Sequence, residues 1–369
     1  MNISLLKKLA GRILAVPLVR KFINRFQLVL YRILSISKLL AVPYHLIFSR
    51  AFDREIFAYT NAIHQYNRNV LHVLSSNVAL RRNIHRLEKG LIMENRRPVF
   101  GLDYIQETLE TYAAVLENPQ EVSLELGEVH WAHDVLEEFF AVSDSAHSLI
   151  HRLKQKFDDL PQPAEVDKSE RFAPFERRQR ENLDIPTYQS FLDLSLKRRS
   201  VRWFQDKKVP RELVDKALVA ASLAPSACNR QPFQYRIFDD PQLVNDVVRI
   251  PFNTAGFADS IPMVIVVVGD LSDFFSPRDR HVIYIDAALS IMSFLYALET
   301  LGLSSVTINC PDFGIIENRF KKQLNLKPFE RPVLMIGVGF AKSKGRIPYS
   351  TKKSLDLLRS YNDVGRDPS

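Results

Sequence analysis

Hydrophobic positions along the chain follow two different patterns, and the change between them divides the sequence. Up to about residue 160, apolar side chains recur every three or four residues, which is the spacing of amphipathic helices. After about residue 187, helical segments alternate with short apolar runs that are typical of buried strands. The pattern therefore predicts an all-α extension followed by an α+β domain, with a central β-sheet flanked by helices.

The first region is predicted to hold helices over residues 51–75, 77–91, 104–116 and 128–157. Two prolines, Pro161 and Pro163, then precede a charged run with few residues that could form a core. These features predict a domain boundary there. The expected organisation is a basic amphipathic segment (1–50), an all-α module (51–160), a linker (161–186) and an α+β domain (187–369).

The second region is predicted to alternate helices and strands. The predicted helices are 188–197, 210–223, 241–249, 281–301 and 314–324. The predicted strands are 234–238, 262–269, 304–308 and 332–339. Because the run 262–269 is almost wholly apolar, we expect both faces of that strand to be covered.

Charge is concentrated at the N-terminus. The chain has a formal net charge of +8, and residues 1–50 contain nine Lys or Arg and no Asp or Glu. The remainder is therefore close to neutral, at about −1. Because the basic residues belong to one segment and not to a face spread over the fold, a nucleic-acid partner is not expected.

The basic segment has three interpretations. Its apolar helical face and cationic side chains suit the surface of an anionic membrane, from which we expect a cytoplasmic protein that is peripheral on the inner face of the membrane. The same face could pack on its own protein or on a partner, and the absence of acidic residues is also compatible with a transit peptide. No apolar run there reaches the roughly 18 residues of a spanning helix. The two cysteines, Cys228 and Cys310, indicate a reducing compartment.

Three stretches of the α+β domain could carry chemistry. Arg198, Arg199, Ser200 and Arg202 could bind a phosphate through charge-assisted hydrogen bonds, or could form a solvated basic face. The loop 224–232 is bracketed by prolines and could present backbone N–H groups to a ligand, or could be an ordinary helix-to-strand turn. The third stretch, 306–311, ends a predicted strand, where ligands commonly sit in sheets with covering helices.

The helical module contains two polar groupings. His85, Glu88 and Lys89 share one helix face, which Arg96 and Arg97 extend; the face could contact an anion or could be a solvated set of charge pairs. His147 and His151 have i, i+4 spacing on the predicted helix 128–157, but Ser148 stands where a zinc motif would have glutamate. No metal site is expected, because two ligands alone rarely make one. Nucleotide-binding glycine motifs and the G-x-S-x-G motif are absent from the sequence.

Three motifs in order resemble the FMN-dependent nitroreductase family over residues 187–360. They are Arg-Arg-Ser-Val-Arg-x-Phe from Arg198, Ala-Pro-Ser-x-x-Asn-x-Gln-Pro from Ala224, and a long apolar helix that closes on Leu-Gly-Leu at residues 301–303. The resemblance implies a homodimer with FMN at the subunit interface. The phrase His85 to Leu91 also resembles extensions on nitroreductase-like proteins linked to bacterial surface-polysaccharide synthesis.

The resemblance implies roles for individual residues. Arg198, Arg199, Ser200 and Arg202 would hold the FMN phosphate and the polar edge of the flavin, and Pro225, Ser226, Ala227 and Asn229 would reach the flavin of the other subunit. Asn309 and Cys310 match a stretch near flavin N5, and Lys352 or Lys353 would complete the phosphate site. Asn253 is a further candidate, for contact with the pyrimidine edge of the flavin. The chain departs from the family at Ser304-Ser305 and at Cys310, where glycine or a small residue is common.

The sequence thus supports two functional hypotheses. The first is an FMN-dependent oxidoreductase that takes electrons from NAD(P)H and passes them to a small or envelope-related acceptor, such as a nitro compound or a quinone, in alternating half-reactions. No side chain is expected to act as a dedicated catalyst, because the flavin carries the chemistry. The alternative is a membrane-surface or assembly protein whose flavin domain is vestigial.

Overall fold

The computed structural model describes residues 17–49, 52–71, 78–118, 125–164 and 171–362. The chain divides into two compact units, 1–60 and 61–369. The first unit contains α2 (Pro17–Leu34), the short α3 (Lys38–Pro43), a turn of π-helix (Tyr44–Ser49) and the start of α4 (Asp53–Leu71). Ser37 caps α3 by accepting the Leu39 N–H through its hydroxyl at 3.1 Å.

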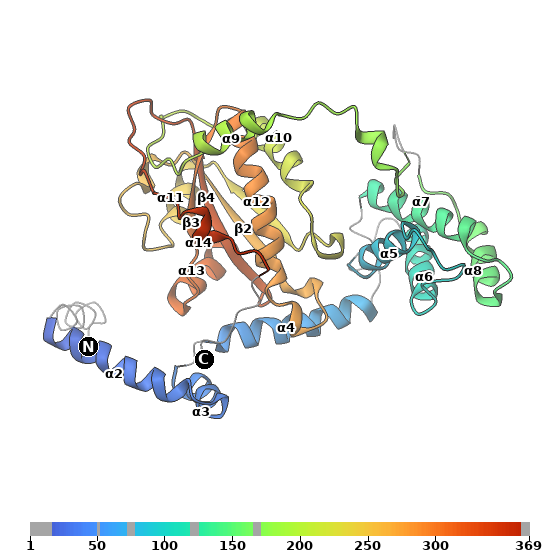
Figure 1. The fold of residues 1–369 in the computed structure, drawn as a ribbon, viewed down its shortest axis with the longest axis horizontal. Helices are drawn as coiled ribbons and strands as arrows, with labels where there is room; N and C mark the ends of the chain where they lie inside the picture. The colour runs from blue at the N-terminus through green and yellow to red at the C-terminus, as the bar shows by residue number, and fades with distance from the viewer. Residues whose placement is uncertain (1–16, 50–51, 72–77, 119–124, 165–170, 363–369) are drawn as a thin grey trace. The chain divides into compact units, whose positions relative to one another are not determined.

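The second unit begins with the rest of α4 and continues with four helices packed around one apolar core (Figure 1). These are α5 (Val78–Leu91), α6 (Ile105–Glu117), α7 (Leu126–Val142) and α8 (Ser148–Asp158). Each contributes fully buried side chains, among them Leu87, Leu109, Phe139 and Ile150. The all-α extension expected from the sequence is therefore present, and its apolar period is the cause. The domain boundaries drawn from the sequence stay a prediction.

One predicted helix was wrong. The pattern over 128–157 suggested a single helix, whereas the structure ends α7 at Val142 and starts α8 at Ser148. Asp144 accounts for the break, because its side chain accepts the Ala146 N–H at 2.9 Å and its own N–H donates to Pro98 O at 2.9 Å. His147 consequently precedes α8 as its N-cap and does not share a helical face with His151.

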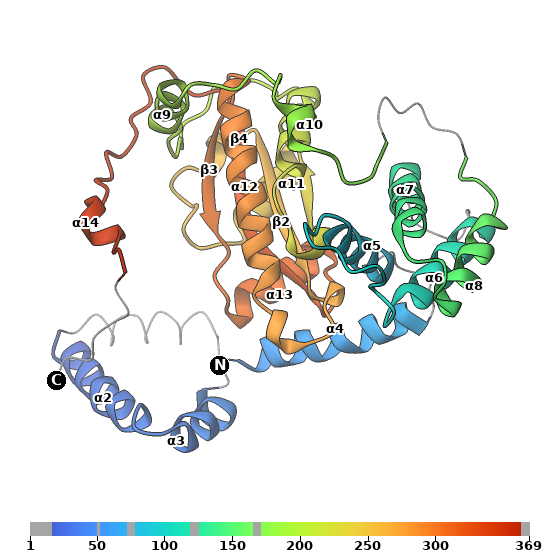
Figure 2. The same cartoon turned by 45° about the vertical axis from the view of Figure 1, so that its right-hand side comes forward.

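The α+β domain is built on one four-stranded antiparallel sheet (Figure 2). Its strands are β1 (Phe233–Phe238), β2 (Met263–Asp270), β3 (Ser304–Asn309) and β4 (Glu330–Gly339), in the order β1-β2-β4-β3. All four strands expected from the sequence are present, and β3 forms one edge. The α+β class with one central sheet is therefore confirmed.

Strand β2 shows why the sheet needs helices on both sides. Met263, Ile265 and Val267 join a core cluster with α10 (Arg211–Ser222) and α12 (Val282–Thr300). The alternate residues Val264, Val266 and Val268 join the opposite cluster with α11 (Pro241–Val248) and α13 (Gly314–Leu324). An apolar strand with two covered faces is what the sequence predicted.

Helix α12 packs along one face of the sheet. It ends at Thr300, and Gly302 follows with a φ of +77° that lets the chain reverse, while Leu303 N–H donates to Leu298 O at 2.9 Å. Among the described residues, the stretch Pro277–Thr300 is long and apolar enough to cross a membrane. Its buried side chains nevertheless belong to the core around the sheet, so length and composition are weak evidence for a span.

The remaining described elements are short or peripheral. Helix α9 (Tyr188–Lys197) precedes the arginine-rich motif and is capped by Thr187, whose hydroxyl accepts the Ser190 N–H at 3.2 Å. Single turns of 3-10 helix occur at 177–180, 227–229, 258–260, 271–273 and 277–279, and α14 (Leu355–Leu358) lies near the C-terminus.

Candidate functional site

The arginine-rich motif lies beside the start of edge strand β3. Ser200 forms an isolated parallel bridge with Ser305, and the Val201 N–H donates to Ser305 O at 2.9 Å. Arg198 and Arg202 are half-buried, and within the described part of the chain neither guanidinium donates a hydrogen bond. Two half-buried cationic forks with free donors suit a phosphate or another planar anion.

The motif is tied to the C-terminal segment. Arg199 donates from Nη2 to the carbonyl oxygen of Pro348 at 2.8 Å and also to that of Tyr349. The exposed Lys352 and Lys353 follow Tyr349 within a few residues. The structure therefore ties the segment just before these lysines to the arginine cluster. Whether Lys352 or Lys353 completes a phosphate site stays a prediction.

The loop 224–232 is held by a buried carboxylate that sequence reasoning missed. Asp286 on α12 is 4% exposed, and its Oδ2 accepts both the Ser226 hydroxyl and the Ala227 N–H at 2.8 Å. The Ser226 hydroxyl oxygen in turn accepts the Gln231 N–H at 2.8 Å. An aspartate inside an otherwise apolar helix was the available signal, because a buried charge needs partners.

This loop is strained. Cys228, Asn229 and Gln231 have φ values of 53°, 50° and 51°, in the left-handed region that non-glycine residues rarely adopt. Each such residue costs about 1–3 kcal/mol, and the conformation persists only where the surroundings hold it. Gln231 contributes by donating from Nε2 to Asn229 Oδ1 at 3.0 Å. The hydrogen bonds around Ser226 and Asp286 thus fix a conformation that the local sequence would not keep alone.

The helical extension also supports the loop. Arg81 on α5 donates from Nε to Asn229 O at 3.0 Å and pairs with Glu128 on α7. Its guanidinium carbon lies 5.6 Å from the centroid of the Trp131 ring. Burial lowers the pKa of Arg81, while nearby Asp273 acts in the opposite direction. Arg81 therefore links the extension to the loop, which the sequence alone did not indicate.

Asn309 ends β3 and Cys310 follows it, whereas the arginine motif lies beside the start of that strand. Asn309 is exposed, whereas Cys310 is half-buried against the core, and burial raises the pKa of its thiol to about 12. The thiol is therefore protonated at neutral pH and is a weak nucleophile. Asn253 is exposed and follows Phe252, whose ring centroid lies 5.8 Å from that of Phe313. This ring contact brings the Asn253 loop near the segment after Cys310.

Helix α12 separates the two halves of the candidate site within one chain. The loop is held by Asp286 near the first turn of α12, whereas Arg198 lies close to Glu299 at its last turn. Burial raises the pKa of Glu299, and Lys197, Ser304 and Arg198 act in the opposite direction. Thirteen residues separate Asp286 from Glu299, or about 20 Å at about 1.5 Å per residue. The structure does not bring the loop and the arginine cluster together.

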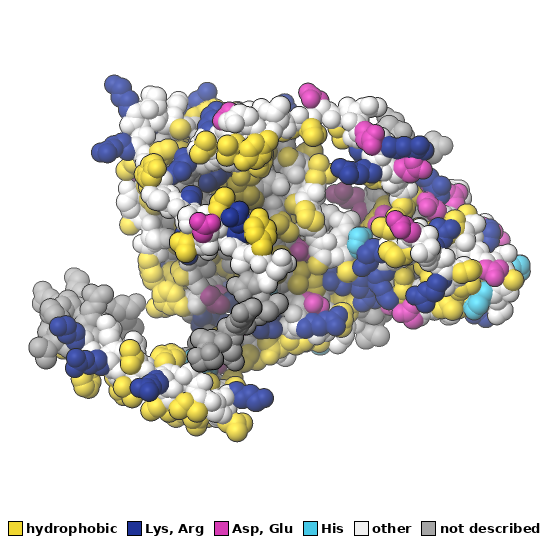
Figure 3. All heavy atoms as spheres, viewed as in Figure 1, with side chains coloured by type: hydrophobic (Ala, Val, Ile, Leu, Met, Phe, Trp, Pro, Cys, Tyr) yellow, Lys and Arg dark blue, Asp and Glu magenta, His cyan; other side chains and the backbone are white. Residues whose placement is uncertain are grey.

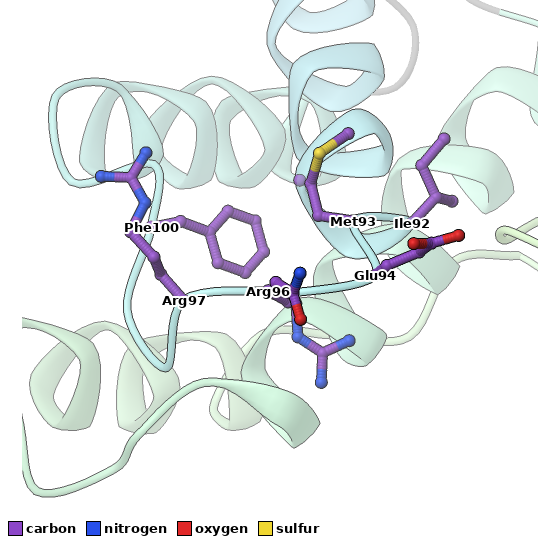
Figure 4. A pocket seen from close by; sticks show the side chains of 8 residues that line it. Ile92, Met93, Glu94, Arg96, Arg97 and Phe100 are labelled. Atoms are coloured by element: carbon purple, nitrogen blue, oxygen red, sulfur yellow. The ribbon is translucent and has the colours of Figure 1, made fainter.

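His85, Glu88 and Arg96 make their side-chain contacts within the helical module. Glu88 lies 3.3 Å from His85 Nδ1 through Oε2 and accepts the Trp131 indole N–H at 2.9 Å through Oε1. Arg96 and Arg97 border a surface hollow of about 540 Å³ in the loop after α5, with Phe100 beside them (Figure 4). These contacts agree with the charge-paired interpretation of the helix face.

Comparison with known proteins covers the α+β domain. Residues 196–250 and 241–340 match the model of the Nitroreductase family. The iodotyrosine deiodinase 1 of Sus scrofa is 25% identical over 198 residues, which cover 46% of this chain and 68% of the relative. The iodotyrosine deiodinase of Thermotoga neapolitana is 28% identical over 172 residues, covering 40% and 87%.

An FMN-dependent nitroreductase from Clostridium difficile has 21% identity and a TM-score of 0.41, covering 46% of this chain and 99% of that one. The motifs of 198–202, 224–232 and 301–303, set on the sheet described above, lie within or beside the matched residues. The resemblance of the α+β domain to the nitroreductase family, which the sequence motifs predicted, is thus confirmed by the family model over residues 196–340.

Proposed function

We propose that this chain is an FMN-dependent oxidoreductase that works as a homodimer, takes electrons from NAD(P)H and reduces a small acceptor. The single observation that carries the proposal is the placement of the two half-sites at opposite ends of α12. A two-fold partner with an antiparallel α12 would set its loop against this chain's arginine cluster. One flavin could then contact both motifs, which the span of about 20 Å prevents within a single chain.

The donor set fits FMN. The family typically binds this cofactor. The phosphate is a dianion, and the free donors of Arg198 and Arg202, with Ser200 between them in the sequence, suit its charge. Lys352 or Lys353, a few residues beyond the segment that Arg199 contacts, would add a further cation. Bound FMN would supply two-electron transfer at its ring system. The guanidinium groups would also favour the negative charge that reduction places on the polar edge of the ring.

The other residues would position the ring. Asp286 holds the backbone of the loop Pro225 to Asn229 in place, so the loop would offer the partner's flavin a preorganised binding surface. Asn309 and Cys310 would border the reacting edge, and Asn253 would lie on the loop beside them. Since the Cys310 thiol is protonated at neutral pH, it would act by its shape and not as a nucleophile.

The acceptor is part of the proposal. Nitro compounds, quinones and an envelope-related molecule are candidates, and the iodotyrosine deiodinase relatives add iodotyrosine. Purified full-length protein should be yellow and should bleach when NADH or NADPH is added without oxygen. Each acceptor is then added in turn, and the one that restores the colour fastest at low concentration is the preferred class. Protein that stays colourless after incubation with FMN would refute the proposal.

The alternative, an assembly protein with a vestigial flavin domain, is not favoured. The matched relatives are named as enzymes, and the arginine cluster and the held loop are both intact in this chain. Flavin that binds but is not bleached by either nicotinamide cofactor would support the alternative instead.

A further inference from the structure

The N-terminal unit exposes an apolar helical face that has no core of its own. On α2, Phe22, Phe26, Val29 and Ile33 are 71%, 60%, 55% and 49% exposed. Their spacing of four, three and four residues places them on one face. Among the residues of 17–49 whose burial the structure describes, Leu34 alone is buried. These four large apolar side chains therefore stay exposed to solvent unless a surface outside this unit packs against them.

Basic side chains lie beside this face. Lys21, Arg25 and Arg32 are exposed and are spaced by four and seven residues, so they form a second stripe along α2. Figure 3 shows dark blue and yellow side chains along the segment that Figure 1 labels α2. Residues 1–50 contain no Asp or Glu, so nothing within that stretch neutralises the stripe.

We infer that α2 lies in the surface of an anionic lipid membrane. In that position the apolar face enters the boundary between headgroups and acyl chains, and the basic stripe remains among the headgroups. Helix α2 has 18 residues and carries Lys and Arg along its length, so it lies on the membrane and does not span it.

Charge decides between lipid and a second copy of this chain. Two copies of the α2 surface would bring basic stripes together without any acidic residue from 1–50 to offset them. An anionic lipid surface has the opposite charge and satisfies both stripes at once. Such binding would hold the oxidoreductase domain at the inner face of the membrane, and the inference stands whether or not that domain binds FMN.

The test measures sedimentation of the full-length protein with vesicles. Vesicles of phosphatidylcholine alone are compared with vesicles that also contain phosphatidylglycerol, at low and high salt. Binding should need phosphatidylglycerol and should weaken with salt. Replacing Lys21, Arg25 and Arg32 together by Gln should weaken binding about 100-fold, since each cation contributes about 1 kcal/mol near the surface.

A matched pair of variants separates the face from the charge. Phe26→Asp and Leu28→Asp each place one negative charge on α2. Phe26 belongs to the apolar face, whereas Leu28, which is 68% exposed, lies on the side of the helix that carries the basic stripe. Phe26→Asp should weaken vesicle binding at least about tenfold more than Leu28→Asp. Equal effects of the two changes, or no binding to phosphatidylglycerol, would overturn the inference. Self-association without lipid that Phe26→Asp abolishes would overturn it in favour of a second copy.

Discussion

Asp286 offers the sharpest test of the candidate site, because both hydrogen bonds that it makes to the loop end on one oxygen. Its Oδ2 accepts the Ser226 hydroxyl and the Ala227 N–H, each at 2.8 Å. In Asp286→Asn the amide oxygen can occupy that place and keep both bonds. In Asp286→Ala both donors lose their acceptor, and the left-handed residues 228, 229 and 231 lose their restraint.

The magnitudes follow from these contacts. Hydrogen bonds to a charged group contribute about 1.5–3 kcal/mol each, so Asp286→Ala should lose about 3 kcal/mol or more from the ordered loop. If FMN binding must restore that order, its dissociation constant should rise about 100-fold. For Asp286→Asn, which loses only the charge, we expect a loss of about 1 kcal/mol and a change of about fivefold.

The assay is an FMN titration of apoprotein followed by flavin fluorescence, with urea unfolding measured in parallel. Ser290→Ala is the control, because Ser290 lies one turn further along α12 and bonds to Ala221 O and to the Tyr235 hydroxyl, not to the loop. This control should lower stability without changing FMN affinity. Unchanged FMN affinity in Asp286→Ala would refute the role of the loop, and equal losses in the Ala and Asn variants would refute the geometric argument.

Three further predictions test other parts of the structure. Asn229→Ala and Arg202→Ala should each weaken FMN retention without unfolding the chain. A heterodimer of the two variant chains should regain one normal site, because one of its two sites would keep both Asn229 and Arg202. If FMN titration shows no recovery in this heterodimer, the shared interface is contradicted. Gly90→Ala should lower the free energy of unfolding by about 1–3 kcal/mol in urea, because its Cβ would lie 2.3 Å from the Phe100 ring, whereas Gly127→Ala, with nothing within 4 Å, should not destabilise. With a pKa near 12, Cys310 should react with iodoacetamide at pH 8 at least about 100-fold more slowly than a free thiol, as followed by mass spectrometry in Cys228→Ser protein, and its rate should rise with pH toward that pKa.

Local pattern was sufficient for most elements of the α+β domain. Helix α12 was expected over 281–301 and spans Val282–Thr300, because a long apolar run followed by Gly302 marks a buried helix and its end. The run 262–269 became β2 with both faces covered. The break between α7 and α8 was missed, because the apolar period continues across it and only the contacts of Asp144 interrupt the helix.

The sequence by itself determined the fold class, the strands and the motifs of the candidate site, since these depend on residue types within short stretches. Only the tertiary structure showed that Arg81 donates a hydrogen bond to Asn229, 148 residues away, and that Asp286 accepts hydrogen bonds from the loop. It also set the loop and the arginine cluster at opposite ends of α12. The physical reason is that periodicity records which face of an element is buried, whereas the partner of a polar group depends on how distant elements pack.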